Sequence, residues 1–174
     1  DVNAPTIGAD QRAAVVGLAT TGARLAVLVG PAGTGKSFTV AAMANAWAEV
    51  TTAQGTPGRM VGLAVSQGAT EVLRDEGLTA ARNITQWLKA HENLTAGSTA
   101  AEDRAWRLNP TDVVMIDEAS MVSTRELRDI QGIVTTAGAR LILTGDPRQL
   151  GSVEAGGVMD LLDGHAETYT LTDV

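Results

Sequence analysis

Residues 28–37, LVGPAGTGKS, place three glycines, a lysine and a serine directly behind an apolar run. They fit the pattern G-x-x-x-x-G-K-[ST], in which a strand leads into a glycine-rich loop and then into a helix. Glycines let the backbone curl so that its N–H groups point at phosphate oxygens, and the helix adds the positive end of its dipole. The lysine contacts the β- and γ-phosphates, and the serine hydroxyl can bind Mg²⁺. The loop therefore predicts that ATP and Mg²⁺ are bound by Gly30, Gly33, Thr34, Gly35, Lys36 and Ser37.

A second polar signature, VVMIDEAS at 113–120, ends another apolar run. An acidic residue at the end of such a strand is costly unless its charge is compensated, and a nucleotide-bound Mg²⁺ would compensate it. Asp117 is placed to bind the metal, directly or through water, and Glu118 to take a proton from the attacking water. The alternative is an ordinary strand-end pair at a helix N-terminus, where carboxylates are favourable. Because the phosphate loop lies in the same chain, we favour the metal ligand and the base.

A third signature, LILTGDPRQL at 141–150, follows one more apolar run. The amide of Gln149 can both donate and accept hydrogen bonds, so it could hold the γ-phosphate and the attacking water together. The alternative is a simple proline-containing turn, and the residues alone do not decide between the two.

Apolar runs alternate with helical patterns along the chain. The sequence predicts strands at 24–30, 59–65, 111–117 and 140–146, with a further candidate at 167–174, and helices at 10–22, 35–50, 67–77, 84–92 and 123–138. The last helix opens with a capping box formed by Ser123 and Glu126, and residues 93–110 read as an irregular surface excursion. Fully apolar strands between helices predict an α/β fold, a parallel sheet with helices on both faces. Ligands of such sheets bind at the carboxyl ends of the strands, where the polar signatures lie.

Composition limits the class of protein. The 174 residues suffice for one domain, and they include no cysteine, which excludes disulfides and thiolate metal sites. No apolar run approaches the roughly 20 residues of a membrane span, and the N-terminus lacks the layout of a signal peptide, so we expect a cytoplasmic protein. The missing initial methionine suggests a piece of a longer protein. The net charge of −7 argues against binding of nucleic acid through a generally basic surface, but it allows local contacts.

Taken in order, the segments ADQRAAV, GPAGTGKS, GLAVSQGATEVLRDEG, VVMIDEASMV and LILTGDPRQLGSVEAGG resemble a known family. They are similar to the first RecA-like domain of superfamily 1B DNA helicases, the RecD-like group. The resemblance is greatest to the helicase part of conjugative relaxase–helicases of the TraI/TrwC (MobF) kind. It covers nearly the whole chain and implies a RecA-like P-loop NTPase fold, with residues 1–174 as one domain. It also implies single-stranded DNA and a second RecA-like domain of the same polypeptide as partners, and 5′-to-3′ movement.

The resemblance also assigns roles to individual residues. It implies that Gln11 reads the adenine edge, that Lys36 and Ser37 bind phosphate and Mg²⁺, that Asp117 and Glu118 are the metal ligand and the base, and that Gln149 senses the γ-phosphate. It further implies DNA contacts by Ser66, Gln67 and Thr85, to whose face Arg148 could add charge. Family members often carry Pro-Thr or Pro-Ser where this chain has Val65-Ser66. A solvated helix residue is the alternative for Gln11, and a solvated loop residue is the alternative for Arg148.

Two rival functions stay open at this point. One is a RecD-like repair helicase with no role in conjugation, and the other is a nucleotide-gated binding or scaffold domain without motor activity. Glu118 and Gln149 argue against the second, because a pure switch needs neither a base nor a sensor. On the helicase reading, the 174 residues alone should hydrolyse ATP poorly. Among the tryptophans, Trp87 is expected in the core, and Trp106 is the one candidate for stacking on a base.

Overall fold

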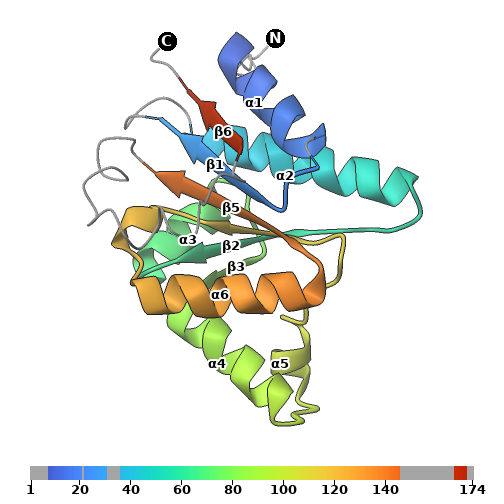
Figure 1. Ribbon diagram of the computed structural model, residues 1–174, viewed down its shortest axis with the longest axis vertical. Helices are drawn as coiled ribbons and strands as arrows, with labels where there is room; N and C mark the ends of the chain where they lie inside the picture. The colour runs from blue at the N-terminus through green and yellow to red at the C-terminus, as the bar shows by residue number, and fades with distance from the viewer. Residues whose placement is uncertain (1–7, 21, 31–35, 146–166, 172–174) are drawn as a thin grey trace.

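The computed structural model describes residues 8–20, 22–30, 36–145 and 167–171, with only the backbone for residues 36–38. Its described strands form one six-stranded sheet in the order β3-β2-β4-β5-β1-β6 (Figure 1). Their bounds are Leu25–Val29 for β1, Met60–Ala64 for β2, Ala81–Asn83 for β3, Val113–Ile116 for β4, Arg140–Gly145 for β5 and Glu167–Thr170 for β6. Every neighbouring pair is parallel, which confirms the predicted parallel sheet.

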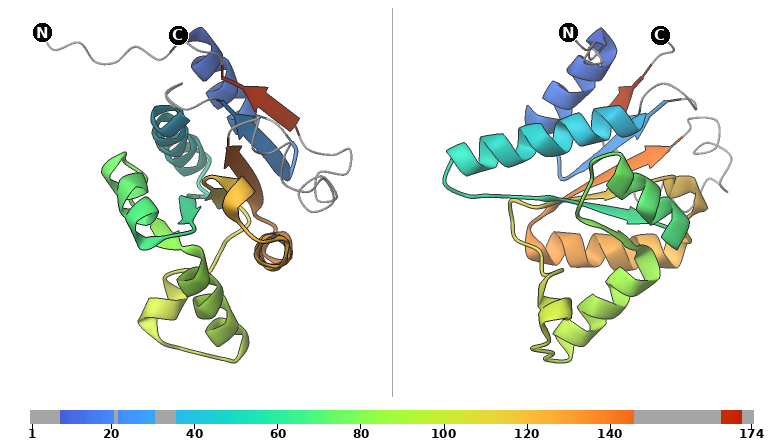
Figure 2. Two further views of the ribbon diagram at one scale, coloured as in Figure 1. Left: turned by 90° about the vertical axis from the view of Figure 1, so that its left-hand side faces the viewer. Right: turned by 180° about the vertical axis from the view of Figure 1, so that it is seen from behind.

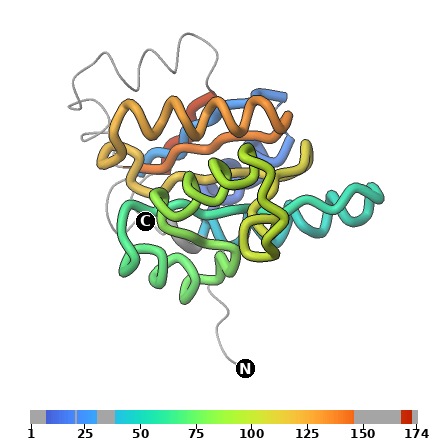
Figure 3. The backbone as a smooth tube through the Cα atoms, turned by 90° about the horizontal axis from the view of Figure 1, so that it is seen from below, coloured from blue at the N-terminus to red at the C-terminus, as the bar shows by residue number. Residues whose placement is uncertain are grey.

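Helices cover both faces of this sheet, as predicted. They are α1 (Ala9–Thr20), α2 (Lys36–Ala53), α3 (Gln67–Asp75), α4 (Ile84–Thr95), α5 (Ala101–Arg104), the 3-10 turn η1 (Ala119–Met121) and α6 (Thr124–Ala137). Figure 2 shows α2 and α3 on one side of the sheet and α6 on the other. In Figure 3, seen from below, α4 lies beside α6.

Two hydrophobic clusters join the helices to the two faces. Trp87, Leu127 and Ile130 from α4 and α6 pack in the cluster that contains Val114 and Ile116 of β4. The other cluster takes its helical members from α1, α2 and α3, and its β4 members are Val113 and Met115. Alternate residues of β4 therefore face opposite layers, as a strand buried on both sides requires. Trp87 is fully buried, which confirms the expectation that it belongs to the core.

Some short elements depart from the predictions, β3 and α5 among them. β3 was not expected, and α5 lies inside the stretch 93–110 that the sequence marked as irregular. Both are too short for a periodic pattern to appear, since β3 has three residues and α5 has four. The predicted capping box of α6 is confirmed, because Ser123 Oγ accepts from Glu126 N and the Glu126 carboxylate accepts from Ser123 N. No described helix is long and apolar enough to cross a membrane.

Candidate nucleotide site and DNA-facing edge

The predicted site segments meet at one edge because all strands run in the same direction (Figure 1). At this edge β1 leads toward the phosphate loop, β4 ends before Asp117, and β5 ends before the predicted sensor segment. Gly30 N donates to Gly145 O at 3.2 Å, so the last residues of β1 and β5 are held together. Asp117 N donates to Leu63 O at 2.9 Å and extends the pairing of β4 with β2. The prediction that these strand ends converge is therefore confirmed for the described residues.

The phosphate loop itself is described only at its two sides. Gly30 is buried at the end of β1, and α2 begins at Lys36, so a strand and a helix flank the loop as its motif requires. Thr39 and Val40 are buried in the first turns of α2 and fix this helix against the sheet. Five predicted site residues lie outside the described residues: Gly33, Thr34, Gly35, Arg148 and Gln149. The side chains of Lys36 and Ser37 lie outside them as well.

Asp117 is oriented by a residue that sequence reasoning did not single out. Thr144 on β5 is 1% exposed, and its hydroxyl donates to Asp117 Oδ1 at 2.9 Å. Because β5 lies between β4 and β1, this bond aims the carboxylate toward the strand that leads into the phosphate loop. A threonine at the end of the apolar run LILTG was a usable signal, since a buried hydroxyl must find a partner.

The backbone at Glu118 is left-handed, with φ 48° and ψ 53°. It is the one non-glycine residue of the described chain with a positive φ. This conformation costs an ordinary residue about 1–2 kcal/mol and is found mostly where the surrounding structure enforces it, often at functional sites. Here it turns the chain from β4 into η1, where Met121 N donates to Glu118 O at 2.8 Å. The half-buried Glu118 is thus placed directly beyond Asp117 by a strained turn.

An oxygen-ligand Mg²⁺ fits the donor chemistry present at this edge. The described part of the chain contains no group of three or more acidic, histidine or cysteine residues able to hold a metal ion by themselves. Mg²⁺ in nucleotide sites is held by one or two protein oxygens together with phosphates and water, so a single oriented carboxylate such as Asp117 is adequate.

Gln11 lies in the first turn of α1 and is 7% exposed. Its Oε1 accepts from Gly8 N at 2.9 Å, and its own backbone N donates to Asp10 Oδ1 at 2.8 Å. The alternative of a solvated helix residue is therefore wrong. The side chain is instead held against the chain that leads into α1.

The residues predicted to touch DNA lie near one another beyond β2 and β3. Ser66 is the exposed N-cap of α3, where its Oγ accepts from Ala69 N, and Gln67 and Thr85 are exposed as well. Asn83 connects the two segments, because its Nδ2 donates to Val65 O at 3.1 Å and its Oδ1 accepts from Thr85 N at 3.0 Å. Asn83 was missed by sequence reasoning, although an asparagine before ITQWL is a recognisable N-cap.

Trp106 is less suited to stacking on a base than the sequence suggested. The Arg82 guanidinium lies over its ring, 4.9 Å from the centroid, and the ring packs against the cluster that contains Trp87. A ring held between a cation and the core has little surface left for a nucleobase.

Comparisons with known proteins agree with this geometry. A family model described as an AAA domain matches residues 6–174. The probable conjugal transfer protein TraA of Sinorhizobium fredii is 33% identical over 152 residues, which cover 85% of this chain and 12% of that protein. The RecBCD enzyme subunit RecD of Mycobacterium tuberculosis is 38% identical over 152 residues, which cover 79% of this chain and 26% of that protein. The chain therefore spans about an eighth to a quarter of the length of these relatives.

The solved structures support the fold. The Pif1 helicase from Candida albicans aligns with a TM-score of 0.62 over 97% of this chain and 40% of that chain, at 16% identity. The predicted RecA-like P-loop fold and the resemblance to RecD-like and conjugative-transfer proteins are thus confirmed.

Proposed function

We propose that this chain, which belongs to the AAA domain family, is the ATP-binding motor domain of an ATP-dependent DNA helicase. The observation that carries the proposal is the placement of Asp117 and Glu118. They follow β4 at the edge where β1 enters the phosphate loop, with Asp117 oriented by Thr144 and Glu118 set beyond it by a left-handed turn. A scaffold that only binds nucleotide would not need a strained acidic residue at this position.

In this proposal ATP lies across the carboxyl edge of the sheet. Lys36 and the backbone of the loop that contains Gly33, Thr34 and Gly35 would hold its phosphates, and Gln11 would contact the adenine. Ser37 and Asp117 would hold Mg²⁺, which when bound neutralises charge on the phosphate oxygens. The fixed position of Gln11, whose Oε1 accepts from Gly8 N, supports its assignment, because a contact to a base edge needs an amide held in one orientation.

The hydrolytic step would use two residues of this chain. Glu118 would accept the proton of the water that attacks the γ-phosphate, and Gln149 would hold that water and report the state of the phosphate to the rest of the protein. The half-burial of Glu118 supports this role, since a base must be shielded from bulk water and yet reach the site.

The proposed track for single-stranded DNA passes Ser66, Gln67 and Thr85, with Arg148 as a further contact. Hydroxyl and amide groups suit contacts that do not read sequence. Asn83 supports the assignment, because it ties the two segments that carry these residues into one surface. Movement along DNA needs two domains that open and close against each other. We further propose that residues 1–174 form one of these domains. A second RecA-like domain of the same cytoplasmic polypeptide would be its partner.

Of the two pathways suggested by the relatives, conjugative transfer is the one we propose, on the motif resemblance to relaxase–helicases. A repair helicase is the alternative, since RecD is matched over a similar share of this chain. An assay of the full-length protein for nicking of one strand at a specific transfer origin separates them, because a helicase without a relaxase does not cut at such an origin.

The function is tested by unwinding of a labelled duplex with a 5′ single-stranded tail, using the full-length protein. The expected result is strand separation that requires ATP and Mg²⁺ and is abolished by Lys36→Ala. Efficient nucleotide binding without DNA-stimulated hydrolysis or unwinding would contradict the motor and favour the scaffold.

A further inference from the structure

A groove of about 980 Å³ runs between α4 and α6, on the face of the sheet away from α1, α2 and α3. It lies outside the nucleotide site and was not predicted from the sequence. Residues at helical spacing line it, with Thr85, Lys89 and Glu92 on α4 and Arg125, Arg128 and Asp129 on α6. Thr85 is therefore both a predicted DNA contact and the first residue of this groove.

The groove is lined by slightly more positive than negative side chains. Four cations and three carboxylates line it, so its net charge is +1, and the Lys89–Glu92 pair is neutral as a unit. Glu92 pairs with Lys89 at 2.8 Å, and Glu126 accepts hydrogen bonds from the backbone and the hydroxyl of Ser123. Arg125 and Arg128 are exposed in the first turns of α6, which begins just beyond β4 at the carboxyl edge. In a chain with a net charge of −7, a groove of net charge +1 with two exposed arginines thus begins at Thr85.

We propose that single-stranded DNA continues from Thr85 into this groove, where Arg125 and Arg128 bind its phosphates. The inference rests on the proposed helicase function and extends its DNA track onto α6. Residues three apart face the same side of a helix, so the two guanidinium groups can contact successive phosphates of one strand. Arginine suits this role because its planar fork donates two parallel hydrogen bonds to a phosphate.

Continuity favours DNA over an acidic polypeptide as the occupant. The groove begins at Thr85, which Asn83 holds beside the Val65–Ser66 segment, so one strand can pass from the end of β2 to α6 without leaving the surface. Contacts to phosphates alone are also what a protein needs when it must move along any sequence.

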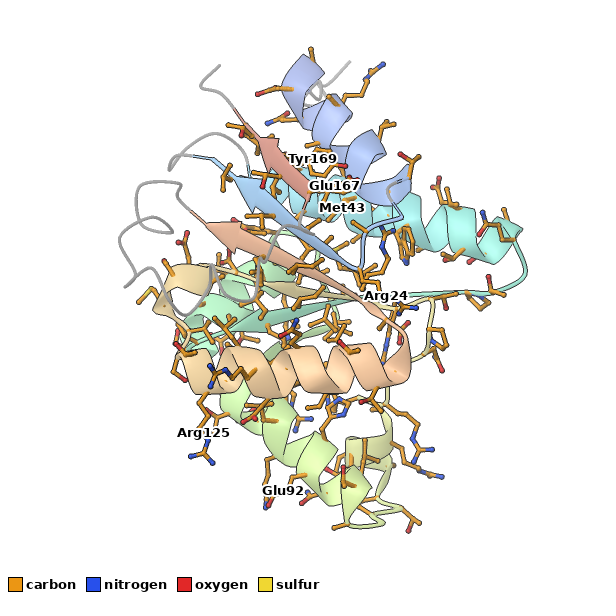
Figure 4. All side chains as sticks on the ribbon, in the orientation of Figure 1. Arg24, Met43, Glu92, Arg125, Glu167 and Tyr169 are labelled. Carbon is orange, nitrogen blue, oxygen red and sulfur yellow. The ribbon has the colours of Figure 1, made fainter. Side chains whose placement is uncertain are left out.

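The test compares Arg125→Ala and Arg128→Ala, alone and together, with the matched control Arg24→Ala in the full-length protein. Arg24 is an exposed arginine just before β1, at the opposite edge of the sheet, as the labels in Figure 4 show. Alanine keeps α6 helical, so helix loss does not confound the result. Fluorescence anisotropy of a labelled oligothymidine is measured over a range of salt concentrations, with and without poly-glutamate as competitor.

Each arginine that binds a phosphate contributes about 0.7 to the slope of log affinity against log salt for a single strand. The double variant should therefore lose about 1.4 from the slope and about tenfold or more in affinity near 0.1 M salt, whereas Arg24→Ala and nucleotide binding stay unchanged. Retention of the wild-type slope by the double variant, with weaker binding by Thr85→Ala, would overturn the inference and leave the proposed function intact. No oligothymidine binding by the wild type would overturn both. Equal competition by poly-glutamate would identify a site for acidic proteins and also overturn the inference.

Discussion

Replacing Thr144 with valine tests how Asp117, the proposed metal ligand, is held without changing Asp117 itself. Valine has the shape of threonine and suits a buried strand, so the substitution removes the hydroxyl and little else. The lost bond is the 2.9 Å contact from Thr144 Oγ1 to Asp117 Oδ1. Because Asp117 is only half-buried, water can replace part of this bond, and we expect the free energy of unfolding to fall by only about 1 kcal/mol.

The effect on nucleotide binding should be larger and selective. Groups that orient a metal ligand are typically worth about 10- to 100-fold in metal affinity or activity, which is roughly 1.4–2.7 kcal/mol. Valine at position 144 should therefore weaken Mg²⁺-dependent binding of ATP by about 10- to 100-fold. Binding of ATP in the presence of a chelator should not change, because the phosphate loop is untouched.

The assay is a titration of a fluorescent ATP analogue with the wild type and with Thr144→Val, in Mg²⁺ and in EDTA. Thr144→Ser is the matched control, since it keeps the hydroxyl and should retain most of the Mg²⁺-dependent affinity. Equal weakening in Mg²⁺ and in EDTA would mean that Thr144 supports the fold of the site rather than its metal ligand. An unchanged affinity in both would refute the reasoning altogether.

Three further predictions concern other parts of the molecule. Lys36→Ala should abolish ATP binding measured by calorimetry, because the loop would lose the full positive charge that contacts the phosphates; unchanged affinity would contradict the assignment. Asn83→Ala should cost about 1 kcal/mol of stability and weaken oligothymidine binding, whereas Asn83→Asp should keep the cap and lose only the bond to Val65. The Ser98 hydroxyl, helped by the Asn93 amide, holds the pKa of Asp103 below its ordinary range. The stability that Asp103 contributes is therefore complete above about pH 4 and lost as the pH falls through the lowered pKa, so melting curves of Asp103→Asn should lack this acid-dependent part.

The sheet and its site edge were predictable because their signals are local and strong. Short apolar runs such as LIL at 141–143, bounded by turn residues, are typical of buried strands, and parallel strands end at a common edge, which brings Gly30, Asp117 and Gly145 to one side of the sheet. The capping box at Ser123 is equally local, since both partners lie within one turn of helix.

The features that escaped prediction depend on contacts between distant segments. Thr144 lies 27 residues from Asp117, and only the pairing of β4 with β5 shows that they meet. Asn83 looked like a plain helix cap, and its second bond to Val65 O follows from the pairing of β2 with β3. The left-handed turn at Glu118 left no mark in the sequence, because glycine or asparagine is the usual residue for that conformation.

The central claim is that Glu118 is the base of an ATP-hydrolysing motor, and one measurement tests it most directly. Single-turnover ATP hydrolysis on single-stranded DNA is compared between the full-length wild type and Glu118→Gln, with ATP affinity measured on the same samples. The account predicts unchanged ATP and DNA binding and hydrolysis slowed by about 100-fold or more. Hydrolysis at the wild-type rate, or a loss of ATP binding as large as the loss of rate, would contradict it.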